Sequence, residues 1–89
     1  MESKEQSIVG ASAYLLYMRK SHKMSQYELA KLCHKGQTYI SDIETGRRSG
    51  NTVKTLMDIA DAMNMNYEDF FSGLGKYLDD EKEGKAWMP

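Results

Sequence analysis

The residues from Gln37 to Asp42 have the clearest chemical potential in the sequence, and their chemistry is hydrogen bonding. If this segment is a helix, its polar side chains share one face at spacings i, i+1, i+4 and i+5, opposite Ile40 and Ile43. These polar residues are Gln37, Thr38, Ser41 and Asp42. Their amide and hydroxyl groups can both donate and accept hydrogen bonds, and the carboxylate can accept them. The pattern therefore predicts a binding surface on one helix.

No arrangement of residues that supports catalysis is recognisable in the sequence. It shows no nucleophile next to a base, no glycine loop able to cradle phosphates and no paired carboxylates. His22, Cys33 and His34 are the visible candidates for a metal site, but we expect Cys33 on the inward face of a helix as a small apolar residue. We therefore expect no enzyme activity, no metal and no cofactor.

Length and composition indicate one small domain. The chain has 89 residues, of which 40% are hydrophobic, and a mean hydropathy of -0.66. A domain of this size is marginally stable alone, so we expect a compact helical bundle or a dimer. The lone Cys33 fits a reducing compartment, and the uncharged run from Gln6 to Met18 is too short for a spanning helix and wrongly flanked for a signal peptide. We expect a cytoplasmic protein without membrane contact.

The charges are distributed unevenly along the chain. The formal net charge of -1 combines +5 over residues 19–54 with -5 over residues 55–89. A basic segment followed by an acidic one is typical of a localised surface that binds a polyanion, although ordinary solvated surface is the alternative explanation. Charge alone does not decide between the two.

Apolar spacing and helix-end signals predict an all-α fold, a compact five-helix bundle. Ser25 and Glu28 have the spacing of a capping box, Gly46 is a helix-ending glycine, and Asn64 and Asn66 end one helix and begin the next. The helices are expected at residues 7–22, 25–33, 37–45, 52–63 and from 66 to about 73. Val53 is expected among the inward residues of the fourth helix.

The C-terminal part is expected to be a separate acidic tail. We place the domain at residues 1–73 and the tail at residues 74–89, with Leu74 and its neighbours forming at most one more helical turn before a solvated end. An apolar set in this half of the chain is a candidate dimer surface. Its members are Met57, Tyr77, Leu78 and Trp87.

Two short helices joined by a turn, at residues 25–33 and 37–45, have the outline of a helix-turn-helix, in which the second helix enters the DNA major groove. The residues extend this outline into a longer pattern. They are Ser25-Gln26-x-Glu28-Leu29-Ala30, then Gln37-Thr38-Tyr39-Ile40-Ser41-x-Ile43-Glu44-x-Gly46-Arg47-Arg48, then Leu56-x-x-Ile59-Ala60-x-Ala62-Met63, then Phe70-Phe71. Over about residues 8–72 the chain resembles the phage-repressor and Cro type of domain, the XRE-like helix-turn-helix family.

The resemblance implies a small transcriptional regulator that binds double-stranded DNA, a repressor acting at an operator as a homodimer. The alternative on the same fold is an antitoxin or anti-repressor type of module that binds a protein partner through the C-terminal segment. The resemblance also implies that Arg19 pairs with Glu44 to fix the second helix of the motif. Base-reading residues would be Gln37, Thr38, Ser41 and Asp42. Residues that contact the sugar-phosphate backbone would be Gln26, Tyr39, Thr45, Arg47 and Arg48.

The turn between the two helices departs from the family pattern. His34 stands where the family has glycine, Lys35 where it has an aliphatic residue, and Gly36 where it has a capping serine or threonine. Either His34 takes a left-handed conformation or Gly36 assumes the role of the glycine. Lys35 cannot be buried unpaired, so either the turn opens or Lys35 points at DNA phosphates.

Overall fold

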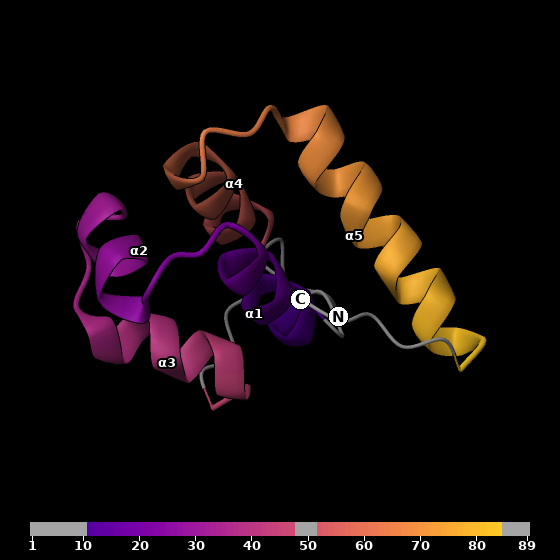
Figure 1. Ribbon diagram of the computed structural model, residues 1–89, viewed down its shortest axis with the longest axis horizontal. Coiled ribbons are helices and arrows are strands. Elements are labelled where there is room, and N and C mark those ends of the chain that lie inside the picture. The colour runs from indigo at the N-terminus through magenta and orange to yellow at the C-terminus, as the bar shows by residue number, and fades with distance from the viewer. Residues whose placement is uncertain (1–10, 48–51, 85–89) are drawn as a thin grey trace, which may run out of the picture.

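Five α-helices make up the protein in a computed structural model that describes residues 11–47 and 52–84. The helices are α1 (Ala11–Ser21), α2 (Gln26–Leu32), α3 (Gln37–Thr45), α4 (Val53–Ala62) and α5 (Tyr67–Lys82). The described residues form no strand, and the all-α, five-helix expectation is confirmed. In Figure 1, α2 and α3 lie at one side of the molecule, α5 lies at the other side, and α1 and α4 lie between them.

Local signals set most helix ends as expected. The Ser25 hydroxyl accepts from the Glu28 amide at 3.0 Å, and the Ser25 amide donates to the Glu28 carboxylate at 2.8 Å, which completes the capping box. The Asn66 side chain accepts from the amide of Asp69 at the start of α5. Gly46 ends α3 with a left-handed φ of 76°. These short-range contacts fix where α2, α3 and α5 begin or end.

The turn between α2 and α3 is closed by an unusual left-handed residue. His34 has a φ of 59°, whereas Gly36 has an extended φ of -81° and caps α3 without a side-chain hydrogen bond. The Lys35 amide donates to the Ala30 carbonyl at 2.9 Å, which holds the turn against the end of α2. His34 therefore takes the conformation that glycine takes in the family pattern, and Lys35 is left exposed.

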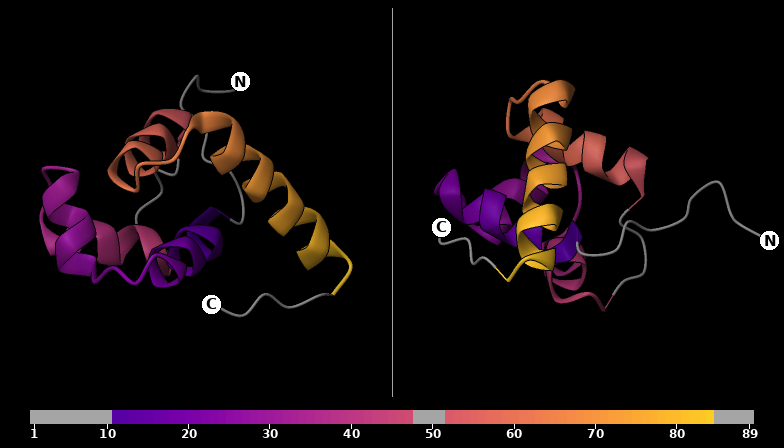
Figure 2. Two further views of the ribbon diagram at one scale, coloured as in Figure 1. Left: turned by 45° about the horizontal axis from the view of Figure 1, so that its top comes forward. Right: turned by 90° about the vertical axis from the view of Figure 1, so that its right-hand side faces the viewer.

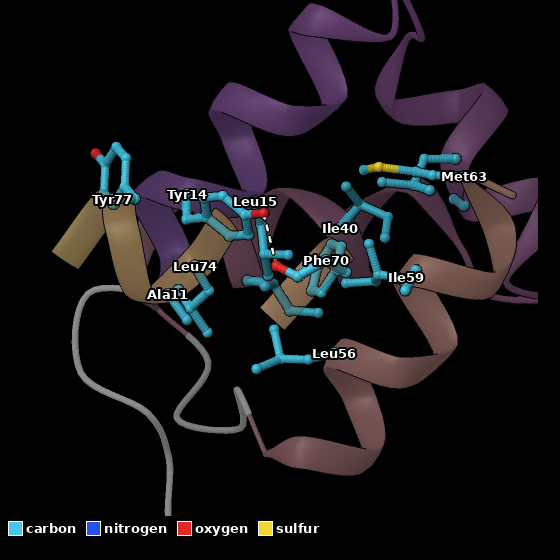
Figure 3. Packing of buried hydrophobic residues seen from close by; sticks show 14 residues of the cluster. Ala11, Tyr14, Leu15, Ile40, Leu56, Ile59, Met63, Phe70, Leu74 and Tyr77 are labelled. Carbon is cyan, nitrogen blue, oxygen red and sulfur yellow. Dashed lines mark hydrogen bonds between the residues drawn. The ribbon is translucent and has the colours of Figure 1, made fainter. Parts of the chain in front are cut away.

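The core lies where the five helices converge, and Tyr14 is the largest side chain fully enclosed in it (Figure 3). Its hydroxyl donates to the Phe70 carbonyl at 2.8 Å. The Phe70 ring packs edge-on against the Tyr14 ring, with 5.4 Å between the two ring centres. Burial raises the pKa of Tyr14 to about 12. The other buried apolar residues are Ala11, Leu15, Leu29, Ala30, Ile40, Ile43, Leu56, Ile59, Ala60, Met63, Phe70, Leu74 and Tyr77.

The end of the chain differs most from expectation. α5 continues to Lys82, so the expectation of at most one turn after Gly73 is wrong, and the boundary placed there falls inside a helix. Leu74 and Tyr77 are buried, with the Tyr77 ring 5.7 Å from that of Tyr14. Packing against α1 stabilises residues that the sequence presents as a glycine-rich acidic tail. Tyr77 is consequently core and not part of an exposed apolar set, and Trp87 lies outside the described residues.

One inward assignment on α4 is also wrong. Val53 is 53% exposed, although it has helical spacing to the buried Leu56 and Ile59. It is the first residue of α4 and extends past the end of the core, so the periodic pattern continues one turn further than the packing does. Within the described ranges, no helix is long and apolar enough to cross a bilayer.

Gly73 shows why α5 can lie so close to α1. A Cβ atom at this position would stand 2.5 Å from the Tyr14 hydroxyl, a buried group that is hydrogen-bonded to the Phe70 carbonyl. We expect Gly73→Ala to lower the free energy of unfolding by about 1–3 kcal/mol through overpacking, although alanine normally gains about 1 kcal/mol over glycine inside a helix. Urea unfolding followed by circular dichroism measures the change.

Two variants test the origin of this effect. A Cβ at Gly75 meets nothing within 4 Å, so Gly75→Ala should stabilise the protein by the helix-propensity gain. In a Tyr14→Phe background the nearest ring atom to the new Cβ is 3.4 Å away, and the penalty of Gly73→Ala should shrink or vanish. A stabilising Gly73→Ala in the parent protein would show that the clash does not control this packing.

Candidate nucleic-acid interface

The outward face of α3 carries the polar residues singled out from the sequence. Ile40 and Ile43 are each 1% exposed and anchor the opposite face in the core. Gln37 and Thr38 are exposed at the first turn of α3, whereas Ser41 and Asp42 are half-buried. The four side chains thus lie on one amphipathic helix, and those at its N-terminal end are the most accessible.

A buried ion pair fixes the far end of α3 to α1. Arg19 Nε donates to Glu44 Oε2 at 2.6 Å, and Arg19 Nη2 donates to Glu44 Oε1 at 3.0 Å. Arg19 Nη1 also donates to the Met24 carbonyl at 2.8 Å, so the same guanidinium holds the connection between α1 and α2. Only 10% of the Arg19 side chain and 3% of the Glu44 side chain are exposed. This bidentate, mostly buried pair joins α1 to α3.

Two glutamines extend this contact towards the exposed face. Gln26 Nε2 donates to Glu44 Oε1 at 3.0 Å, and Gln37 Nε2 donates to Gln26 Oε1 at 3.3 Å. The first residues of α2 and α3 are therefore joined through their amides to the buried carboxylate. Sequence reasoning missed these contacts, because the only signal is that a glutamine begins each helix of the motif. Gln26 and Gln37 are positioned before any ligand arrives.

Arg47, which follows the end of α3, lies near the carboxylate of Asp42 on this helix. Arg47 Nη1 lies 3.7 Å from Asp42 Oδ1, in a pair whose arginine side chain is 76% exposed. The Thr45 hydroxyl donates to the carbonyls of Ser41 and Asp42, so its proton is used within the helix. Arg47 thus reduces the repulsion that Asp42 would exert on a polyanion. Arg48 lies outside the described residues.

Lys35 and Tyr39 form the other edge of the surface. The Lys35 ammonium lies 5.2 Å from the centre of the Tyr39 ring, within the range of a cation–π contact. Tyr39 is half-buried and packs on the core, so the exposed Lys35 contacts a ring that the core holds in position. No group of residues able to hold a metal ion occurs in the described part of the chain.

The acidic residues of α5 stand away from this surface. Figures 1 and 2 place α5 across the molecule from α2 and α3, with α1 and α4 between them. The exposed carboxylates of α5 include Glu68 near its start and Asp79 and Glu81 near its end. A polyanion at α3 would therefore meet the basic segment of the chain with the carboxylates of α5 on the opposite side.

Comparison with protein families agrees with this geometry. A family described as helix-turn-helix matches residues 15–70, more than half of the chain, from within α1 to the first turn of α5. The chain belongs to the XRE-like helix-turn-helix family. This is a family of DNA-binding regulators, and in this member α2 and α3 are the two helices of the motif. A search of curated proteins finds no match.

Proposed function

We propose that this XRE-like protein is a cytoplasmic transcriptional repressor that binds a specific double-stranded operator. α3 would lie in the major groove, where each base pair presents a distinct pattern of donors and acceptors. The observation that carries the proposal is the exposed Gln37 and Thr38 at the start of a helix whose other end is locked by Arg19 and Glu44. A rigid helix with polar side chains outward has the properties that base recognition needs.

The proposed contacts fall into two classes with different consequences. Base contacts would come from Gln37 to adenine N6 and N7, from Thr38 to thymine, and from Ser41 and Asp42 further along α3. Backbone contacts, which position the domain without reading sequence, are assigned to residues around the motif. They are Gln26, Lys35, Tyr39, Arg47, Arg48 and Thr45, whose hydroxyl would exchange its present carbonyl acceptors for a phosphate oxygen.

We further propose that the protein binds as a homodimer. One helix of nine residues contacts only a few base pairs, whereas two-fold pairing would set two copies of α3 into successive major grooves about 34 Å apart. In this arrangement α5, with its acidic residues, would lie away from the duplex.

In vitro selection of bound duplexes from a random pool tests the proposed function. We expect recovery of a palindrome with half-sites one helical turn apart, which would establish specificity and dimerisation together. Recovery of no enriched sequence, combined with purification of a stable complex with another protein, would favour the alternative of an antitoxin or anti-repressor type of module. An enriched site without symmetry would retain DNA recognition but contradict the homodimer.

Arg47 provides a test of the phosphate contacts. We expect Arg47→Ala to weaken binding to all duplexes alike and to reduce the slope of log affinity against log salt by about one. Fluorescence anisotropy at several salt concentrations, with the selected operator and a shuffled duplex, measures both effects. Lys20→Ala is the control, since it removes one exposed positive charge from α1. A loss confined to the selected operator would instead make Arg47 a base-reading residue.

A further inference from the structure

A second surface, the α2 groove, lies on the side of α2 that faces away from the core. Its lining comes from α2 and the turns at both ends of this helix, and it has a volume of about 580 Å³. The lining residues are Lys23, Met24, Glu28, Lys31, Leu32 and His34. None of these residues belongs to the surface assigned above to DNA.

The floor of the α2 groove is apolar and accessible. Leu32 is 52% exposed, which is unusual for a leucine in a helix that also buries Leu29 and Ala30. Met24 contributes its thioether from the turn before α2, and a flexible thioether adapts to differently shaped apolar partners. The lining is more apolar than polar, so it suits a ligand that brings an apolar side chain.

The rim of the groove is positively charged. Lys23 and Lys31 are exposed, and no ion pair involves either of them within residues 11–47 and 52–84. The acidic residue of the groove, Glu28, is already engaged, because its carboxylate accepts from the Ser25 amide in the capping box. Lys23 and Lys31 outnumber the single carboxylate of Glu28, so the rim has a net positive charge, and such a rim beside an apolar floor favours a ligand that is both acidic and apolar.

Helical geometry separates the α2 groove from the DNA surface. Gln26 points to Glu44 and Gln37, whereas Glu28, Lys31 and Leu32 lie on the opposite, exposed side of α2. An apolar floor contributes nothing to phosphate binding, so the combination favours a protein segment over nucleic acid. A ligand in the groove would leave α3 free.

From these observations we propose that the α2 groove docks an acidic, amphipathic helical segment of a partner protein. Apolar residues of the segment at i, i+3 or i+4 would pack on Leu32 and Met24, and its carboxylates would pair with Lys23 and Lys31. Such docking would allow the protein to hold a partner while it is bound to DNA. The inference does not depend on the DNA-binding proposal, because the two surfaces share no residue.

The test titrates the full chain, labelled with ¹⁵N, with a synthetic helical peptide that has leucines on one face and glutamates on the other. We expect the largest amide shifts at residues 23–34, and at least tenfold weaker binding of a scrambled peptide of the same composition. Lys31→Glu and Leu32→Ser should each weaken binding at least fivefold. Lys20→Glu makes the same charge change on an exposed part of α1 and should have little effect.

Several results would overturn the proposal. Equal binding of the ordered and scrambled peptides, or amide shifts centred elsewhere, would show that the groove is not a specific docking site. If Lys31→Glu lowers DNA affinity more than Lys20→Glu does, the α2 groove contacts DNA instead of a protein segment. If Leu32→Ser changes the mass of the assembly measured by sedimentation equilibrium, the α2 groove is instead a contact between copies of this protein. If Leu32→Ser also lowers stability, the result for Lys31→Glu alone decides whether the groove binds the peptide, because the Lys31 side chain is exposed and its replacement should not disturb folding.

Discussion

Arg19→Ala is expected to lower the free energy of unfolding by about 3–5 kcal/mol, the cost of leaving a buried charge without its partner. The Glu44 carboxylate is 3% exposed and would keep only the Gln26 amide as a donor among its present side-chain partners. The loss would be a large part of the total stability of a small domain, typically 5–15 kcal/mol. Urea unfolding followed by circular dichroism measures it directly.

Neighbouring variants separate the ion pair from other effects of the substitution. Lys20→Ala removes an exposed cation from the same helix and should change stability by less than about 0.5 kcal/mol. Replacing Arg19 and Glu44 together by methionine should cost less than Arg19→Ala alone, because no unpaired charge remains. A loss below about 1 kcal/mol for Arg19→Ala would show that the pair does not hold α3 in place.

Gln37→Ala combined with Thr38→Ala is expected to reduce affinity for the selected operator by about 30-fold or more, since two base contacts of about 1–3 kcal/mol each sum to at least about 2 kcal/mol. Affinity for a shuffled duplex should stay nearly constant, because phosphate contacts supply nonspecific binding. Competition anisotropy with the two duplexes gives the specificity ratio. The reason for the selective loss is that both side chains are exposed at the accessible end of α3.

Stability is the control for this double variant. Gln37 makes one long hydrogen bond of 3.3 Å with Gln26, and both replaced side chains are exposed, so the unfolding free energy should change little. Unchanged affinity and specificity would contradict the assignment of these residues to base reading. An equal loss of affinity for both duplexes would show that Gln37 and Thr38 contact phosphates and not bases.

The parts of the fold that could be predicted from the sequence are those that short-range chemistry determines. The hydroxyl of Ser25 and the carboxylate of Glu28 need only each other's backbone, so their capping box forms wherever α2 begins. Gly46 and Asn64 take left-handed conformations that few other residues adopt easily. Because helix ends were set locally, the bounds expected for α3 agree with those observed.

Long-range packing explains what could not be predicted. Gly73 suggests a helix end when only its neighbours are considered, yet inside α5 it leaves space for the Tyr14 hydroxyl, a residue 59 positions earlier in the chain. Burial of Leu74 and Tyr77 against α1 then stabilises the rest of α5. The same limit applies to the site, where the contact of Gln26 with Gln37 follows from the angle between α2 and α3.

The most direct test of the central claim, that α3 is the surface that meets DNA, is an NMR titration of the ¹⁵N-labelled chain with the selected operator. We expect the largest amide shifts at Gln26 and over residues 36–47, with little change over residues 76–83 of α5. Shifts concentrated on α5, or none at low salt, would contradict the account.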